Sequence, residues 1–178
     1  MADVISGEEL RLAVPEPGVR APSPAGEPLY ELIELLFFAY RDFVGGPDRI
    51  LAEYDFGRAH HRVLHFVNRN PGMRVTDLLD ILQITKQSLA RVLKQLVDTG
   101  FIDSRTGDAD RRERLLYATE AGRALALRLA RLQSARLEAA AAALGPAGTE
   151  AAKRFLALVV NEEERPAVLA LARKEGPR

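Results

Sequence analysis

The stretch that decides the fold is residues 75–102, VTDLLDILQITKQSLARVLKQLVDTGFI. Apolar residues recur in its second half at intervals of three and four, at Leu89, Val92, Leu93, Leu96 and Val97. This spacing places them on one face of an α-helix. Thr85 is a suitable N-cap and Gly100 a suitable residue to follow the last turn, so the sequence predicts a helix between them.

A shorter helix precedes this one in the predicted structure. Thr76 can cap it, and its inner face consists of Leu78, Leu79 and Leu82. Only residues 83–84 remain for the turn. Two helices joined by so short a turn form a helix-turn-helix motif, whose second helix enters the major groove of DNA.

The outward face of the second helix is polar. It carries Gln87, Arg91, Lys94 and Gln95, with Ser88 at its edge. An ordinary solvated helix can present the same face, so this feature alone does not establish DNA binding. If the helix does read DNA, its first half lies deepest in the groove. Gln87, Ser88 and Arg91 are then candidates for base edges, and Lys86 and Lys94 for phosphates.

The residues that follow Gly100 favour DNA binding. Residues 101–104 are a predicted strand, RTGDADRRER (residues 105–114) a charged turn, and residues 115–118 a returning strand. A basic hairpin directly after a recognition helix makes a winged helix. The residues that we expect to contact double-stranded DNA are Thr85, Lys86, Gln87, Ser88, Arg91, Lys94, Arg105, Asp110, Arg111 and Arg112. Asp110 is expected to hold an arginine in place, or to tie the wing to the supporting helix, which is the first helix of the helix-turn-helix.

The whole chain has 178 residues, a formal net charge of zero and no cysteine. Disulfides and thiolate metal sites are therefore excluded. No apolar run approaches membrane-spanning length and no signal pattern begins the chain, so we expect a cytoplasmic protein with no membrane partner. It carries no P-loop, G-x-S-x-G or H-E-x-x-H motif. We expect neither an enzyme nor a cofactor.

Helices flank the central motif on both sides. Residues 27–44 are predicted to form a helix that ends at Gly45-Gly46-Pro47, with a connector over residues 48–57 and another helix at about residues 58–69. A long helix should run from Thr119 to about residue 144 and stop at Gly145-Pro146. Two further helical pieces should follow it. Together these flanking helices have more apolar face than one subunit can bury, so we expect a homodimer.

The order of these elements resembles the MarR family of winged helix-turn-helix transcriptional regulators. The resemblance rests on residues 62–102 and on DADRRERLLYATEAG, where Asp110, Arg112, Thr119 and Gly122 fall on the wing motif of that family. It covers about residues 28–172. It implies a mainly α fold with a small β-hairpin wing, in which a winged helix-turn-helix joins a helical dimerisation region.

The domain boundaries follow from this comparison. Residues 1–27, rich in proline and glycine, are expected to form a flexible tail, and residues 28–178 the MarR-like domain. Within that domain the winged helix-turn-helix should span about residues 58–119. The dimerisation helices should span about residues 28–45 and 120–174. The resemblance implies a homodimeric regulator on a pseudo-palindromic operator; the alternative is a winged helix used as a protein-interaction module.

A ligand site is the last expectation. The family frequently binds small aromatic acids between its two lobes, close to the helix at residues 58–69. Here His60 and His61 replace the glutamine and bulky aromatic that are common, and Ala59 replaces a proline. The expected pocket for a small-molecule effector is lined by Phe37, Phe38, Tyr40, His60 and His61. Alternatively, His60 is a hydrogen-bonded core residue and His61 a surface one. His61 and His65 have metal-binding spacing but lack further ligands.

Overall fold

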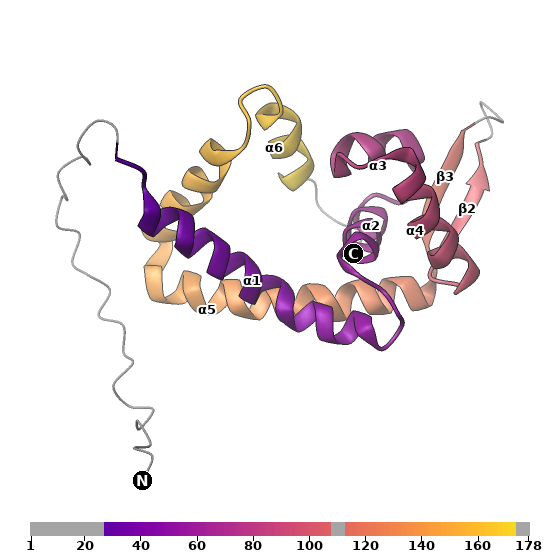
Figure 1. Cartoon of the computed structure of the whole chain (residues 1–178), viewed down its shortest axis with the longest axis horizontal. Coiled ribbons are helices and arrows are strands. Elements are labelled where there is room, and N and C mark those ends of the chain that lie inside the picture. The colour runs from indigo at the N-terminus through magenta and orange to yellow at the C-terminus, as the bar shows by residue number, and fades with distance from the viewer. Residues whose placement is uncertain (1–26, 108–112, 174–178) are drawn as a thin grey trace, which may run out of the picture. The chain divides into compact units, whose positions relative to one another are not determined.

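The computed structural model describes residues 27–107 and 113–173 of the chain (Figure 1). The described elements are α1 (Tyr30–Ala52), α2 (Arg58–Arg69), β1 (Met73–Arg74), α3 (Val75–Leu82), α4 (Lys86–Asp98), β2 (Ile102–Thr106), β3 (Arg114–Ala118), α5 (Glu120–Val159) and α6 (Arg165–Arg173). The chain divides into two compact units at Phe37, inside α1. The first unit contributes the exposed start of α1, and the second contains every other element. The predicted class, mainly α with a small antiparallel sheet, is confirmed.

The helix-turn-helix is α3 and α4, and its turn is as short as the sequence predicts. Gln83 ends α3 in the left-handed conformation, with a φ of 50°. Thr85 caps α4 by accepting a hydrogen bond from the backbone N–H of Ser88. Gly100 follows α4 with a φ of 77°, a region that favours glycine. The expected cap at Thr76 is wrong, because α3 begins at Val75 and its N-cap residue is Arg74.

The wing is part of a three-stranded sheet with the strand order β1-β3-β2. Both pairings are antiparallel, and Ile102 lies opposite Ala118 in the hairpin. The sequence predicts the two hairpin strands to within two residues but not β1. A strand of only two residues is too short to show any periodicity. β1 leads directly into α3, so it connects the sheet to the helix-turn-helix.

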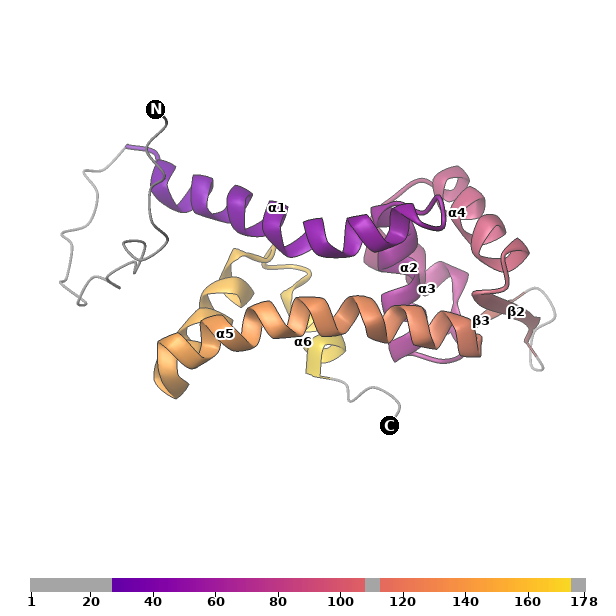
Figure 2. The same ribbon diagram turned by 90° about the horizontal axis from the view of Figure 1, so that it is seen from below.

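Helix α2 lies at the centre of the fold. It packs against α3, α4, α5 and β3. Its inner face, Val63, Leu64 and Val67, is completely buried. The fully buried residues of the same core come from these four elements and also from α1 and β2: Leu51, Leu78, Leu89, Leu96, Ile102, Leu116 and Leu129. Figures 1 and 2 agree in placing α3, α4 and the hairpin together at one end of this unit.

Helix α1 does not end at Gly45, as the sequence suggests, but continues to Ala52. A proline inside a helix removes one hydrogen bond and costs about 3 kcal/mol relative to alanine. Here Val44, Pro47, Ile50 and Leu51 are all buried. Tertiary packing of this face outweighs the poor local propensity. The expected connector over residues 48–57 therefore shrinks to the turn that follows Ala52.

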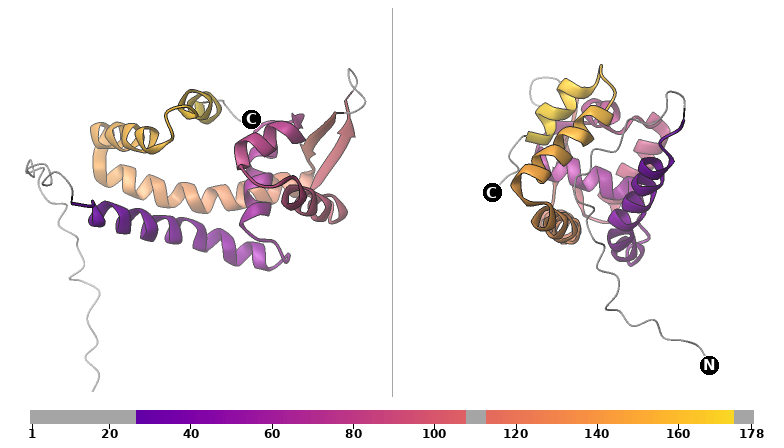
Figure 3. Two further views of the ribbon diagram at one scale, coloured as in Figure 1. Left: turned by 45° about the horizontal axis from the view of Figure 1, so that its top comes forward. Right: turned by 90° about the vertical axis from the view of Figure 1, so that its left-hand side faces the viewer.

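Helix α5 begins at the base of the hairpin and runs away from it (Figure 3). Thr119 caps its start by accepting a hydrogen bond from the backbone N–H of Gly122, 3.1 Å away. The helix continues to Val159 but is broken at Gly145, whose φ of 69° and ψ of 176° are not helical. The expected stop at Gly145-Pro146 is thus present as a sharp break. In the described part of the chain, no helix is long and apolar enough to cross a lipid bilayer.

Candidate nucleic-acid interface

Helix α4 presents a polar face around its first two turns. Lys86, Gln87 and Arg91 are exposed, and Ser88 is half-buried. Within the described residues, Lys86 and Arg91 have no carboxylate within ion-pair distance. Both cations are therefore free to meet an anionic partner. Lys94, one turn further on, is paired with Asp98.

Hydrogen bonds fix the start of α4. The hydroxyl of Thr85 donates to the hydroxyl oxygen of Ser88, 2.9 Å away, and accepts from the backbone N–H of the same residue at 3.1 Å. With its oxygen accepting from Thr85, the Ser88 hydroxyl keeps its own hydrogen for an outside acceptor. The first turn therefore offers a donor whose position is set by the cap.

Gln95 does not belong to the outward face, as its helical position suggested. It is half-buried, and its side-chain oxygen lies 2.9 Å from Nε2 of His60 on α2. The side-chain nitrogen donates to the backbone carbonyl of Asp55 at 3.3 Å. Nδ1 of His60 accepts from the backbone N–H of Gly57, so a neutral ring carries its proton on Nε2 and donates to Gln95. This chain ties the last half of α4 to the turn after α1.

The arginines in the described part of the wing are held by side-chain contacts. The Arg105 guanidinium lies 4.5 Å from the ring centre of Tyr117 and 3.3 Å from the carboxylate of Asp103. Arg114 donates to the hydroxyl of Thr106 across the hairpin. Asp110, Arg111 and Arg112, which the sequence assigns to DNA, lie outside the described residues.

Arg74 joins the supporting helix to the wing, a role that sequence reasoning missed. Its guanidinium lies 2.7 Å from the carboxylate of Asp77 in α3 and 3.3 Å from that of Glu113, the residue just before β3. Hydrogen bonds from Arg74 lower the pKa of the Asp77 carboxyl. An arginine three residues before an aspartate at a helix start is a visible sequence signal, but Glu113 is 39 residues away. The sequence does not reveal that second contact.

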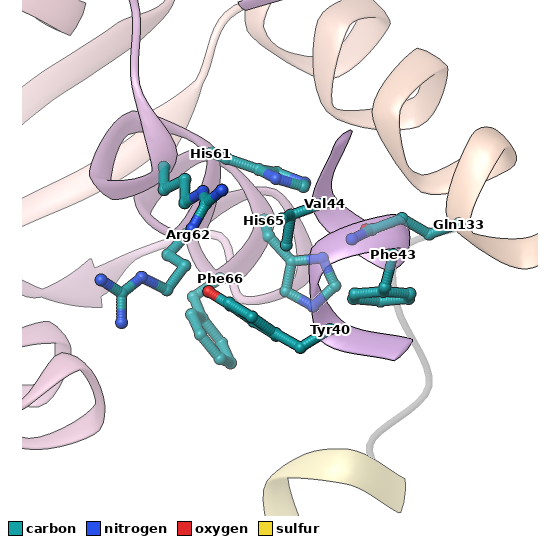
Figure 4. A pocket seen from close by; sticks show the side chains of 9 residues that line it. Tyr40, Phe43, Val44, His61, Arg62, His65, Phe66 and Gln133 are labelled. Carbon is teal, nitrogen blue, oxygen red and sulfur yellow. The ribbon is translucent and has the colours of Figure 1, made fainter. Parts of the chain in front are cut away.

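A cavity of about 260 Å³ lies between α1, α2 and α5 (Figure 4). It is lined by Tyr40, Phe43, Val44, Arg58, His61, Arg62, His65, Phe66 and Gln133. Of the five residues expected to line a ligand pocket, Tyr40 and His61 line this cavity. The structure places Phe38 and His60 elsewhere: Phe38 lies under the Arg41 guanidinium, and His60 stacks on Phe56 at 4.7 Å. Phe37 is exposed in the first unit.

Burial lowers the pKa values of both histidines that line this cavity. It is the main cause that lowers the pKa of His61, opposed by the nearby carboxylate of Asp48. Burial also lowers the pKa of His65, with smaller contributions from the positive charges of Arg69 and His61. Both imidazoles are therefore neutral near pH 7. Within the described residues, no three histidine or carboxylate side chains come together as a metal site.

Comparisons with known proteins agree with this architecture. The sequence profile of the MarR family matches residues 54–113. The HTH-type transcriptional regulator PetP of Rhodobacter capsulatus is 45% identical over 151 residues, which are 80% of this chain and 91% of PetP.

Two similar solved structures contain DNA. Streptococcus pneumoniae FabT in complex with DNA aligns with a TM-score of 0.64 at 17% identity, over 71% of this chain and 91% of FabT. The transcriptional repressor CouR, bound to a 23-mer DNA duplex, aligns with a TM-score of 0.59 at 25% identity, over 74% of this chain and 91% of CouR. The likeness to FabT is one of fold, whereas the identity to PetP extends along most of both sequences. The chain therefore belongs to the MarR family of transcriptional regulators.

Proposed function

We propose that the protein is a homodimeric regulator that binds a pseudo-palindromic DNA operator and is modulated by a small ligand. The observation that carries DNA binding is the exposed start of α4, where two cations lack carboxylate partners within the described residues. The hairpin extends beside this helix, as a wing must. Similar structures in complex with DNA, those of FabT and CouR, support the assignment.

The roles of the individual side chains follow from their places on α4. Gln87, Ser88 and Arg91 lie on the first two turns, where a recognition helix approaches base edges. Lys86 and Lys94 flank them and are assigned to phosphates, with Arg105 on the wing. Thr85 positions Ser88 through the cap. The tip residues Asp110, Arg111 and Arg112 complete the proposed wing contact.

Homodimerisation is proposed from exposed apolar side chains. In the first unit, the start of α1 exposes Leu29, Tyr30, Leu32, Ile33, Leu35, Leu36 and Phe37. In the second unit, the exposed apolar residues of α5 and α6 are Leu127, Leu132, Leu137, Leu144, Phe155, Leu156, Leu158, Val159 and Val168. So many apolar residues on helices exceed what a soluble monomer usually leaves in water. A partner copy that covers them accounts for their exposure.

The ligand is assigned to the cavity of Figure 4. Its walls are mostly apolar, and arginines and histidines provide the polar groups, an arrangement typical of small-molecule sites. α1, α2 and α5 all contribute to it, and α2 packs directly on α4. A ligand that prefers one arrangement of these helices can thereby change DNA affinity; a tenfold change requires about 1.4 kcal/mol of preference.

Selection of bound sequences from random DNA duplexes tests the proposal. A regulator should select a palindromic motif with half-sites about 10 base pairs apart. Arg91→Ala should then weaken the selected site by about 1–3 kcal/mol and random DNA much less. Lys86→Ala, the matched control, should weaken both alike, because phosphates carry no sequence information. If no motif emerges and both variants behave alike, the winged helix serves a protein partner instead.

A further inference from the structure

Two of the cations assigned to DNA phosphates already have a carboxylate partner in the protein. Lys94 forms an ion pair with Asp98, one turn further along α4, and Nη2 of Arg105 lies 3.3 Å from Oδ2 of Asp103 on β2. More than half of each of these four side chains is exposed. Exposed ion pairs are weak, so a phosphate can take the place of the carboxylate. The two pairs therefore lower the positive charge that this surface offers to DNA without blocking it.

Helix stability does not explain the presence of Asp98. It is the last residue of α4, where the partial negative charge of the helix end disfavours a carboxylate, and the last turn has no basic residue. Lys94 precedes Asp98 by four residues, whereas such a pair is more favourable when the acid precedes the base. The helix end is closed without it, because the backbone N–H and the hydroxyl of Thr99 both donate to the carbonyl of Gln95. The effect of Asp98 is therefore mainly on Lys94.

The position of Arg105 on the wing does not depend on Asp103 alone. The two residues are two apart on β2 and therefore lie on the same face of the hairpin. Tyr117 lies opposite Asp103 in the hairpin register, and its ring centre is 4.5 Å from the Arg105 guanidinium. An aromatic ring holds a guanidinium without cancelling its charge, whereas a carboxylate cancels it. Asp103 therefore changes the charge of the wing more than its geometry.

Exchange of a carboxylate for a phosphate changes the number of ions that DNA binding releases. A free lysine or arginine that meets a phosphate releases a cation condensed on the DNA. When Lys94 meets a phosphate, it leaves the Asp98 carboxylate uncompensated, and a cation from solution takes its place. The cation released from the DNA is then offset by the cation taken up at the protein. Because phosphates are the same in every sequence, this loss is the same for an operator and for random DNA.

We propose that Asp98 and Asp103 act as built-in counterions of the DNA-binding surface. They lower its affinity for DNA of every sequence by the same factor, and they leave the discrimination between sequences to the base-edge residues of α4. The proposal deepens the proposed function and rests on it for the assignment of Lys94 and Arg105 to phosphates. It agrees with a formal net charge of zero for the whole chain. Weaker sequence-independent binding shortens each stay of the protein on random DNA.

The test compares carboxylate-to-amide variants of the full-length protein on two duplexes. One is the selected operator, and the other is a scrambled duplex of the same length and composition. Their dissociation constants are measured by fluorescence anisotropy at several salt concentrations between about 0.1 and 0.4 M, where phosphate contacts dominate the salt dependence. Each contact contributes about −0.9 to the slope of log affinity against log salt concentration, which is about eightfold in affinity between 1 M and 0.1 M salt.

Asp98→Asn and Asp103→Asn should each steepen this slope by up to about 0.9 per protomer, or about 1.8 for a homodimer. Both duplexes should be bound more tightly by the same factor, so the ratio of their dissociation constants should stay that of the parent. Unchanged slopes and affinities in both variants would overturn the proposal. A gain on the operator alone would also overturn it, because the carboxylate would then take part in reading the sequence.

Two further variants exclude other causes of tighter binding. Asp98→Ala should behave like Asp98→Asn; a gain confined to the amide would mean that the asparagine itself contacts DNA, against the proposal. In a Lys94→Met background, Asp98→Asn should no longer steepen the slope, because no cation becomes free to meet a phosphate. Equal steepening in that background would mean that Asp98 repels DNA directly, and the counterion role would be wrong.

Glu150→Gln is the matched control for net charge. Glu150 forms a similar exposed ion pair, 2.7 Å from Nζ of Lys153, in the part of α5 beyond the break at Gly145. α5 runs away from the hairpin (Figure 3), so this variant changes the charge of the chain by the same amount but frees no cation beside α4 or the wing. The slope should stay that of the parent. If it steepens as much as in Asp98→Asn, overall charge sets the affinity and the proposal is refuted.

The parent protein distinguishes failure of this proposal from failure of the proposed function. A parent that binds neither duplex refutes the proposed DNA binding and the counterion role with it. A parent that binds DNA, together with amide variants that match it in slope and affinity, refutes the counterion role alone.

Discussion

The contact between α5 and the start of the wing gives a sharp stability prediction. At Gly122, an added Cβ would lie 2.0 Å from the backbone oxygen of Phe101 and 3.0 Å from its carbonyl carbon. Neither atom can rotate away as a side chain would. Gly122→Ala therefore forces α5 to move by about 1 Å from β2, since Cβ contacts below 3.0 Å are essentially never found.

The loss of stability in Gly122→Ala can be estimated from the contacts that this movement of α5 breaks. The same Phe101 oxygen accepts the backbone N–H of Thr119 at 3.1 Å. A lost buried hydrogen bond costs about 0.5–1.5 kcal/mol and overpacking about 1–3 kcal/mol, so the free energy of unfolding should fall by about 2–4 kcal/mol. For a chain of this size, that lowers the melting temperature by about 5–15 °C. Both are measured by urea and thermal unfolding at one fixed protomer concentration, because a dimer's stability depends on concentration.

Gly45→Ala in α1 is the control for this experiment. Its added Cβ meets nothing within 4 Å, and the residue lies inside a helix. Replacing a helical glycine with alanine should raise the free energy of unfolding by about 0.5–1 kcal/mol. A Gly122→Ala variant as stable as the parent would refute the close contact. A destabilised Gly45→Ala would show that α1 requires its glycine for a reason other than space.

Three further predictions concern the wing, pH and assembly. Arg74→Met should weaken binding to the selected operator, because the ion pairs of Arg74 with Asp77 and Glu113, which join α3 to the wing, are then lost. Unchanged affinity would mean that these ion pairs play no part in DNA binding. The pKa values of His61 and His65 are lowered in the folded protein, so below about pH 6.5 the unfolded chain binds more protons than the folded one. The free energy of unfolding should therefore fall as the pH falls, by up to about 1.4 kcal/mol per pH unit for each additional proton. Stability measured from pH 7.5 to 5.0 should be flatter in the His61→Leu/His65→Leu variant, and parallel curves would contradict this. Deletion of residues 149–178 should yield aggregated or unfolded protein, and a soluble monomer that melts cooperatively would count against dimerisation through these helices.

Local signals in the sequence predicted the helix-turn-helix well. The cap at Thr85 and the left-handed Gly100 each depend on a few adjacent residues, so short patterns suffice, although the expected cap at Thr76 is wrong. The continuation of α1 could not be predicted in this way. Gly45-Gly46-Pro47 is a strong local stop, and only the burial of Pro47 and its neighbours in the tertiary structure overrides it.

In the candidate site, too, features set by local sequence were predictable and those set by tertiary packing were not. The exposed cations of α4 follow from helical periodicity, because a surface position needs no partner. Gln95 lies on the same stretch, yet its side chain is directed to His60, 35 residues earlier. The cavity likewise takes His65 and Phe43 rather than His60 and Phe38. Which member of a histidine or phenylalanine pair faces inward depends on the exact rotation of the helix, and periodicity alone does not fix that angle.

The hydrogen-bonded chain from Asp55 through Gln95 to His60 has a mechanical consequence. Asp55 holds the turn after α1 in a left-handed conformation, with a φ of 55°, and offers its carbonyl to α4. The amide of Gln95 is thus held at both ends, by α1's exit on one side and by α2 on the other. If the end of α1 shifts, α4 must either turn with it or give up a bond. If α4 binds DNA as proposed, the angle at which it meets the duplex should therefore depend on the position of α1.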